Sequence, residues 1–315
     1  MTGPPAATAA VRLAVRRALR DLTGPVAAAV SGGADSLALA AALAFERPGS
    51  AALVVDHGLQ AGSAGVAARA ADQCRGLGLA GQVLASPPGP HREQGATSGG
   101  PEALARAARY AALDDVARRT GLVAVLLGHT LDDQAETVLL GLARGSGARA
   151  LSGMAAARGV YRRPLLGTDR VTTRAACAEA GLEPWEDPHN ADRAYARVRV
   201  RSAVLPALEH ELGPGVARAL ARSARQLRED ADALDALTPE LAGEPACAEL
   251  MALLPAVRAR ALKRWAERHA GKAVTGAHVE GLRALVEQWH GQGAVGLPGG
   301  LRVARRDGRL ACRRD

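Results

Sequence analysis

Short apolar runs alternate with amphipathic helical patterns along the first two thirds of the chain. The apolar runs have the length of strands and predict four buried strands, at residues 26–30, 51–55, 82–85 and 123–127. The Ala-rich patterns between and after them predict helices near residues 35–45, 62–76, 101–119 and 131–143. This alternation predicts an α/β fold, a doubly wound and mostly parallel sheet that binds its ligands at the carboxyl ends of the strands.

The last third of the chain has a different pattern. A turn at residues 213–215 precedes a long Ala/Arg/Leu helical pattern that runs through about Leu237, and further helical patterns follow. The final stretch predicts a small hairpin with Asp307–Gly308 at its turn. We therefore predict a catalytic domain at residues 1–212 and a smaller helical α+β domain at residues 213–315.

Composition narrows the class of protein. The chain has 315 residues of which 48% are hydrophobic, enough for a core in each domain. We see neither a stretch of roughly 20 apolar residues, which a membrane span needs, nor a signal-peptide core, and expect a cytoplasmic protein without membrane contact. The cysteines are far apart and form no CxxC pair, so we predict buried thiols at Cys74, Cys177, Cys247 and Cys312.

The charge balance indicates a polyanionic partner. The formal net charge is +8, and arginine carries nearly all the positive charge because Lys263 and Lys272 are the only lysines. Clustered arginine attracts a phosphate backbone before any specific contact forms. With one Phe, three Tyr and three Trp, base stacking has few partners, so arginine contacts and shape should dominate any nucleic-acid binding.

The first chemical motif, SGGADS at residues 31–36, joins the first predicted strand to the first predicted helix. Gly32 and Gly33 allow the backbone to turn tightly and to approach a ligand closely. The hydroxyls of Ser31 and Ser36 can donate to phosphate oxygens, and the amides that open the helix attract an anion. An ordinary glycine-rich turn is the alternative.

This motif lacks the P-loop lysine and the GxGxxG spacing of dinucleotide folds. It resembles the SGGxDS motif of the PP-loop ATP pyrophosphatases, which cleave ATP between the α- and β-phosphates and leave an adenylylated substrate. Asp35 would then help to hold the magnesium ion that bridges the phosphates, because a hard cation prefers carboxylate and phosphate oxygens.

The second motif, GHTLDDQAET at residues 128–137, begins at a strand end and continues as a helix. Asp133 and Glu136 lie on the face opposite the apolar stripe of that helix. Acidic residues in a first turn also favour the helix dipole, which is the alternative explanation. Because His129 ends a strand, we predict that it and the two carboxylates close over the nucleotide and bind metal or a substrate amine.

Two further segments follow predicted strands. Asp56 and His57 come after the second strand, where an acidic residue can bond the ribose or base of a nucleotide, although His57 also suits a turn. The adjacent faces of one helix carry Glu102, Arg106, Arg109 and Tyr110, a spacing that a salt-bridged solvent face also explains. The Gly/Pro-rich loop before that helix, from Ser86 to Pro101, is either a lid or an exposed connection.

The third motif places arginine at every second position, with valines between, at Arg197, Arg199 and Arg201. In an extended segment these side chains would share one face, and in a helix they would fan out over more than half of the surface. Either arrangement suits contacts with phosphates, and a solvated basic face is the alternative.

Together the motifs resemble the tRNA(Ile)-lysidine synthetase family. They are SGGADS, DHGL at 56–59, ARAARY at 105–110, GHTLDDQAET with the following Arg144-Gly145, RRPLL at 162–166 and DPHNADRAYARVRVR at 187–201. The resemblance implies ATP-dependent adenylylation of the C2 oxygen of the wobble cytidine in a CAU-anticodon tRNA(Ile), followed by displacement of AMP by the amine of L-lysine. The product, lysidine, pairs with A rather than G, so the tRNA reads AUA as isoleucine instead of AUG as methionine.

The resemblance also implies roles for individual residues, with ATP and Mg as cofactors and tRNA(Ile) and lysine as partners. The ATP site would comprise Ser31, Gly32, Gly33, Ala34, Asp35, Ser36, Asp56 and His57. The catalytic residues would be Asp35, Arg109, His129, Asp133 and Glu136, with Asp35 and Asp133 as metal ligands. The tRNA would contact Arg144, Arg197, Arg199 and Arg201. Gln60, in place of an arginine after DHGL, and Val198, which interrupts an RNRxR pattern, depart from the family motifs.

Two other kinds of function stay open, a different PP-loop enzyme and a protein without catalytic activity. Other PP-loop enzymes, such as tRNA thiolases and the GMP, NAD and argininosuccinate synthetases, share the ATP chemistry, but the scattered cysteines oppose a sulfur relay. A non-catalytic RNA-binding relative is a second alternative, which the intact Asp35, His129, Asp133 and Glu136 oppose. The sequence leaves open the lysine pocket, the rejection of methionine tRNAs with the same anticodon, and the oligomeric state, a homodimer included. It also leaves open whether Asp133 or Glu136 is metal ligand, general base or amine binder.

Overall fold

The computed structural model describes residues 3–56, 58, 62–85, 101–145 and 147–314, so His57 and the loop before residue 101 lie outside it. The chain divides into two compact units, Met1–Leu227 and Arg228–Asp315. The division falls inside helix α10 (Val216–Ala236), whereas the sequence pattern placed a boundary at the turn before this helix.

The first unit contains a six-stranded sheet of order β3-β2-β1-β4-β6-β5, parallel except for the β5–β6 pair. The strands are β1 (Val26–Val30), β2 (Ala51–Asp56), β3 (Ala80–Ala85), β4 (Ala124–Leu127), β5 (Ala157–Arg158) and β6 (Tyr161–Arg162). The predicted doubly wound, mostly parallel sheet is confirmed, with each of the four predicted strands in place. Strands β5 and β6 have two residues each, too few to give a periodic pattern.

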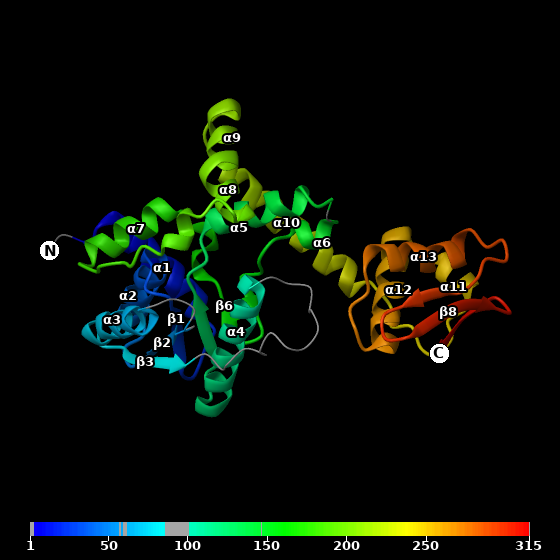
Figure 1. Cartoon of the computed structure of the whole chain (residues 1–315), viewed down its shortest axis with the longest axis horizontal. Helices are drawn as coiled ribbons and strands as arrows, with labels where there is room; N and C mark the ends of the chain where they lie inside the picture. The colour runs from blue at the N-terminus through cyan, green and yellow to red at the C-terminus, as the bar shows by residue number, and fades with distance from the viewer. Residues whose placement is uncertain (1–2, 57, 59–61, 86–100, 146, 315) are drawn as a thin grey trace. The chain divides into compact units, whose positions relative to one another are not determined.

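Helices cover both faces of this sheet. The helices that enclose it are α1 (Ala6–Leu19), α2 (Ala34–Glu46), α3 (Ser63–Gly76), α4 (Pro101–Thr120), α5 (Leu131–Leu142) and α7 (Arg170–Glu179). Shorter helices follow at α6 (Ala148–Leu151), α8 (Ala196–Arg199) and α9 (Leu205–Leu212), with a π-helical turn at Val200–Val204. Figure 1 shows α1, α2, α3 and α7 on one side of the strands and α4 on the other.

Strand β1 has the apolar sequence VAAAV because both of its faces are covered. Val26, Ala28 and Val30 belong to the core cluster of α1, α2, α3 and α7. Ala27 belongs to the second cluster, with Leu113 of α4. Alternate residues of one strand therefore supply two cores, as the period of a strand requires.

The strand order places a topological switch point between β1 and β4. Strands β1, β2 and β3 progress toward one edge, and β4 then lies on the other side of β1. Gly128, after β4, comes so close to the start of α2 that a Cβ atom there would lie 3.2 Å from backbone atoms of Asp35 and Ser36. Ligands of open α/β sheets bind at such a point, beyond the carboxyl ends of the strands.

The second unit is a small α+β domain, as predicted. Its further elements are α11 (Cys247–Ala252), α12 (Pro255–Ala270), α13 (Gly276–Glu287), β7 (Val295–Leu297), β8 (Leu301–Arg306) and β9 (Arg309–Arg314). The hairpin predicted around Asp307–Gly308 is confirmed as β8 and β9, and β7 adds a third antiparallel strand. Trp265 is fully buried at the centre of this unit, and its indole N–H donates to the backbone oxygen of Gly243 at 2.9 Å.

The predicted burial of the thiols is confirmed at Cys74, Cys177 and Cys247, whereas Cys312 is half-buried. Burial raises the pKa of Cys74 to about 11, so this thiol stays protonated at neutral pH. Within the described part of the chain, no helix has the length and apolar character that crossing a membrane requires.

Candidate active site

The segment between β1 and α2 forms a tight loop that is bonded to itself. Gly32 has a φ of +85°, a conformation that favours glycine. The Ser36 hydroxyl accepts the backbone N–H of Ser31 at 3.1 Å and donates to the oxygen of Gly33 at 2.8 Å. The backbone N–H of Trp185 donates to the oxygen of Gly32 at 2.9 Å, which fixes the loop from outside. The amides that open α2, before the N–H groups of Ser36 and Leu37 that donate to the oxygen of Gly33, can attract an anion.

A pocket of about 760 Å³ lies beyond the carboxyl ends of β1 and β4, at the switch point. The residues predicted from sequence that line it are Ser31, Gly33, Ala34, Asp35, Ser36, Arg109, His129, Asp133 and Arg201. Asp56 is not among the described residues that line the pocket, and its carboxylate accepts the backbone N–H of Gly58 at 3.0 Å in a turn. The fold therefore brings most of the predicted site together.

Helix α5 begins with a capping box. The Thr130 hydroxyl accepts the backbone N–H of Asp133, and the Asp133 carboxylate accepts the backbone N–H of Thr130 at 2.8 Å. One oxygen of Asp133 therefore stabilises the helix start, a structural role that adds to the helix-dipole effect considered from the sequence. Its other oxygen, Oδ1, lies 3.0 Å from the Arg170 guanidinium, and the side chain is 13% exposed toward the pocket.

Glu136 lies one turn further on and is 0% exposed. Its carboxylate accepts from Nε of Arg201 at 2.7 Å and from Nε of Arg197 at 2.9 Å. The Arg170 guanidinium is 3.4 Å away. Glu136 is therefore enclosed by guanidinium groups and, unlike Asp133, is not among the described residues that line the pocket.

Arg170, at the start of α7, connects three carboxylates. Its guanidinium lies 3.0 Å from Asp133 and 3.4 Å from Glu136, and its Nε lies 3.6 Å from Asp35. Burial alone would raise the pKa of Asp133, but Arg170 and the backbone N–H of Thr130 together outweigh it, and the pKa is lowered. Asp133 is therefore ionised at neutral pH.

Asp35 occupies the first turn of α2 beside the loop, and its side chain is 25% exposed. Burial raises the pKa of this carboxyl group, and the Thr173 hydroxyl and Arg170 offset only part of that effect. Among the described residues, no group of three or more His, Cys, Asp and Glu side chains could hold a metal ion by itself. A metal at Asp35 would therefore need oxygen ligands from a substrate.

His129 follows β4 and projects into the pocket. Within the described residues its Nδ1 atom is buried and has no hydrogen-bond partner. Burial lowers the pKa of His129 to about 4 against the smaller opposing effect of Asp133, so the imidazole is neutral at pH 7. A buried ring nitrogen without a partner in a pocket is positioned to bond a ligand.

Helix α4 forms the opposite wall. Arg106, Arg109 and Tyr110 line the pocket, so this helix face is not simply a salt-bridged solvent face. Arg106 donates to the Tyr110 hydroxyl at 3.3 Å. Burial and the neighbouring Arg106 lower the pKa of Arg109, which indicates a cation held in a partly desolvated position.

The three alternating arginines do not form one basic face, because the segment is helical and they fan out, which is the second of the two arrangements that the sequence allows. They fall in α8 and the π-helical turn, where Arg197 and Arg201 turn inward to Glu136. Arg199 is exposed, and its guanidinium donates to the backbone oxygens of Arg193 and Ala194 at 2.7 Å each. Arg144 is also exposed, beyond the end of α5, and is not among the described residues that line the pocket.

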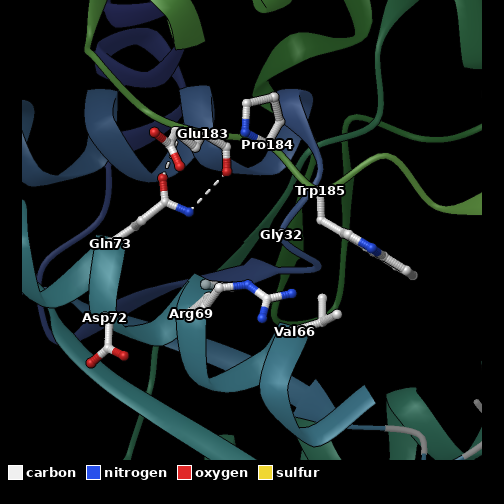
Figure 2. A pocket seen from close by; sticks show the side chains of 9 residues that line it. Gly32, Val66, Arg69, Asp72, Gln73, Glu183, Pro184 and Trp185 are labelled. Carbon is white, nitrogen blue, oxygen red and sulfur yellow. Dashed lines mark hydrogen bonds between the residues drawn. The ribbon is translucent and has the colours of Figure 1, made fainter. Parts of the chain in front are cut away.

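A second pocket, of about 400 Å³, lies on the other side of the loop, where Gly32 lines it. Figure 2 shows the Gln73 side chain directed at the backbone of Glu183 on the opposite wall. The Gln73 amide donates to the oxygen of Glu183 at 3.0 Å and accepts its N–H at 2.7 Å. This pair secures the segment that carries Trp185, which lines both pockets and bonds Gly32.

Sequence reasoning missed Arg170, Thr173 and Gln73. Arg170 and Asp133 are 37 positions apart, and Thr173 and Asp35 are 138 apart, so no local spacing reveals these pairs. Arg170 does follow a recognisable helix start, because Asp169 caps α7 by accepting the N–H of Thr172 at 2.9 Å. The cap predicts the helix but not the direction of its side chains.

Comparisons with known proteins agree with this arrangement. A family model described as a PP-loop domain matches residues 12–208, and one described as the TilS substrate binding domain matches residues 246–311. The chain is 55% identical to a tRNA(Ile)-lysidine synthase of Leifsonia xyli over 296 residues, which cover 89% of this chain and 87% of the relative. The chain belongs to the tRNA(Ile)-lysidine synthase family.

Another member of the tRNA(Ile)-lysidine synthase family, from Streptomyces coelicolor, is 49% identical, with 99% of both chains covered. The resemblance seen in the motifs is thus confirmed over nearly the full length. Among solved structures, the U34-tRNA thiolase NcsA of Methanococcus maripaludis aligns with a TM-score of 0.58 and 20% identity, covering 71% of this chain and 80% of the thiolase. That likeness shows a shared fold.

Proposed function

We propose that this member of the tRNA(Ile)-lysidine synthase family joins lysine to the wobble cytidine of a CAU-anticodon tRNA(Ile) in the 760 Å³ pocket. One observation carries the proposal. The PP-loop residues, Asp35, His129 and Asp133 meet in a single pocket at the switch point of the sheet. ATP, a metal ion and the lysine amine can therefore all reach the target cytosine in this one pocket.

In the first step the cytidine C2 oxygen attacks the α-phosphate of ATP, and pyrophosphate leaves. The loop amides and the Ser31 hydroxyl would bind phosphate oxygens, whereas the Ser36 hydroxyl, which donates to the oxygen of Gly33, would hold the loop in shape. Magnesium fits the site, because this cation is commonly held by one or two carboxylates together with substrate phosphates. Asp35, with Asp133 nearby, would hold it, and the ion would neutralise phosphate charge.

In the second step the lysine amine attacks C2, and AMP leaves with the oxygen. Asp133 is ionised and lines the pocket, so it would bind the incoming ammonium group and take up the proton that this group loses before the neutral amine attacks. Glu136 would hold Arg197 and Arg201 in place instead of meeting the amine, because it is enclosed by them. The unpartnered Nδ1 of His129 would bond and orient the substrate.

Exposed arginines would guide the tRNA. Arg144 and Arg199 present charge to solvent, where a phosphate backbone can reach them. The second unit, which matches the substrate binding domain, would provide a further tRNA surface. A cytoplasmic location follows from this substrate and stays a prediction.

The test is a complete reaction. The protein is incubated with ATP, magnesium, labelled lysine and a CAU-anticodon tRNA(Ile) transcript, and the modified nucleoside is identified by mass. Lysidine at the wobble position is expected, with none in a matched reaction of Asp35→Ala or without ATP. A wobble nucleoside that is unchanged, or modified without incorporated lysine, would contradict the proposal.

A further inference from the structure

Two residues in the first turn of α7 face the two oxygens of Asp35, and one of them bonds it. The Thr173 side chain is fully buried, and its hydroxyl donates to Oδ1 of Asp35. Oδ2 of Asp35 lies 3.6 Å from Nε of Arg170, which is longer than a hydrogen bond. Thr173 thus makes a direct bond to the carboxylate, whereas the arginine stays just out of bonding distance.

We propose that Thr173 is a positioning residue that holds Asp35 away from Arg170, so that Oδ2 of Asp35 can bind the magnesium of bound ATP. This inference rests on the proposed function, because it assigns the cation to Asp35. Thr173 itself acts only through the carboxylate, since its one hydroxyl hydrogen already has two acceptors, Oδ1 of Asp35 and the backbone oxygen of Arg170 at 3.0 Å.

Thr173 and Arg170 compete for the Asp35 carboxylate, and this competition explains why the Asp35 side chain must be held in one position. A carboxylate and a guanidinium readily form a two-bond pair, and Arg170 approaches Asp35 with its Nε already at 3.6 Å. A small rotation of the Asp35 side chain would complete that pair and occupy the oxygen that a cation needs. The Thr173 hydroxyl opposes this rotation because it would exchange its charged acceptor for the neutral backbone oxygen of Arg170 alone.

Neighbouring carboxylates hold the Arg170 guanidinium in place. Asp133 and Glu136 accept from it at 3.0 and 3.4 Å, and the backbone N–H of Arg170 donates to Asp132 at 2.7 Å. Arg170 is thus fixed between carboxylates and cannot easily swing away. The distance between Arg170 and Asp35 is therefore decided mainly on the side of Asp35, where Thr173 acts.

The experiment measures equilibrium binding of ATP to the full chain without tRNA or lysine, once with magnesium and once with EDTA. Thr173→Val removes the hydroxyl at nearly constant volume, and Thr173→Ser keeps it. Thr172→Val is the matched control, because that hydroxyl donates to Asp169 rather than to Asp35. The readout is the ratio of the two affinities, which a change in general packing would leave unaltered.

We expect Thr173→Val to reduce the gain in affinity from magnesium about tenfold, the size of a lost bond to a charged group, with unchanged affinity in EDTA. Thr173→Ser and Thr172→Val should keep the wild-type ratio. Should Thr173→Val fail to fold, Thr173→Ala replaces it with the same expectation. A wild-type ratio in either hydroxyl-free variant, or equal losses in both conditions, overturns the inference. Lysidine formation by the wild-type protein, measured alongside, tells such a failure apart from a failure of the proposed function.

Discussion

Nε of Arg201 donates to Oε1 of Glu136 across 2.7 Å, although 65 positions separate the two residues in the chain. The bond joins the π-helical turn after α8 to the middle of α5, and Arg197 adds a second bond to the same carboxylate at 2.9 Å. The buried Glu136 carboxylate therefore holds two arginines in place, and one of them, Arg201, lines the pocket.

The charge of Glu136 should be important for stability. We expect Glu136→Gln to lower the free energy of unfolding by about 3 kcal/mol, because it removes the fully buried charge that half-buried Arg197 and Arg201 pair with. Urea unfolding of both proteins measures the difference. Asp115→Asn is the control, since the exposed pair of Asp115 with Arg119 should contribute under about 1 kcal/mol. Similar small losses in both variants would show that the buried network is not stabilising.

Asp133 should serve the second step of the reaction. Because it lines the pocket and stays ionised, we expect Asp133→Asn to raise the lysine KM and to let an adenylylated tRNA intermediate accumulate. Quenched reactions with labelled ATP would detect the intermediate, and pyrophosphate release would report the first step. If both steps slow together without an intermediate, Asp133 mainly holds the metal.

The salt dependence of tRNA binding should separate the exposed from the inward arginines. The double variant Arg144→Ala, Arg199→Ala should reduce the slope of log affinity against log salt by roughly 1.5, at about 0.7 to 0.9 for each lost phosphate contact. Arg197→Ala should leave the slope unchanged, because this guanidinium already binds Glu136. A slope change in Arg197→Ala alone would restore the phosphate-contact interpretation of that residue.

His129 should make stability depend on pH. Its pKa is about 4 in the folded protein and near 6.5 when unfolded, so between these values the unfolded state binds more protons. Stability should therefore fall as the pH is lowered through this window, by up to about 3 kcal/mol from this residue. Unfolding of wild type and His129→Asn at pH 7 and pH 4 gives the difference, and the variant should lose less. Parallel pH curves would mean that His129 titrates normally.

The Gln73 amide should affect ATP binding at a distance. Gln73→Ala removes both bonds to the Glu183 backbone and loosens the segment whose Trp185 N–H fixes Gly32. We expect a rise in the ATP KM of about fivefold, the effect of roughly 1 kcal/mol, with little change in the lysine KM. Asp72→Ala, on the same helix, is the control, because Asp72 pairs with Arg75 outside this contact. Equal ATP KM values in the two variants would contradict the role.

Local sequence determined the strands, the main helices and the loop. Residues 26–30 are apolar on both faces and are followed by two glycines, so strand and loop are specified within a dozen residues. His129 and Asp35 could be placed together for a similar reason, because parallel strands present their carboxyl ends at one edge. The family followed from the same short motifs, and the comparisons confirmed it.

Only the tertiary structure decided the partners of the charged residues. The alternating pattern of Arg197, Arg199 and Arg201 favoured one shared role, yet the helical turn directs Arg197 and Arg201 to Glu136 and leaves Arg199 in solvent. Thr173 belongs to none of the motifs recognised in the sequence, and its bond to Asp35 forms because α7 packs against α2. Periodicity records which face of an element is buried, but a bond between distant side chains depends on how the elements pack, which local sequence does not encode.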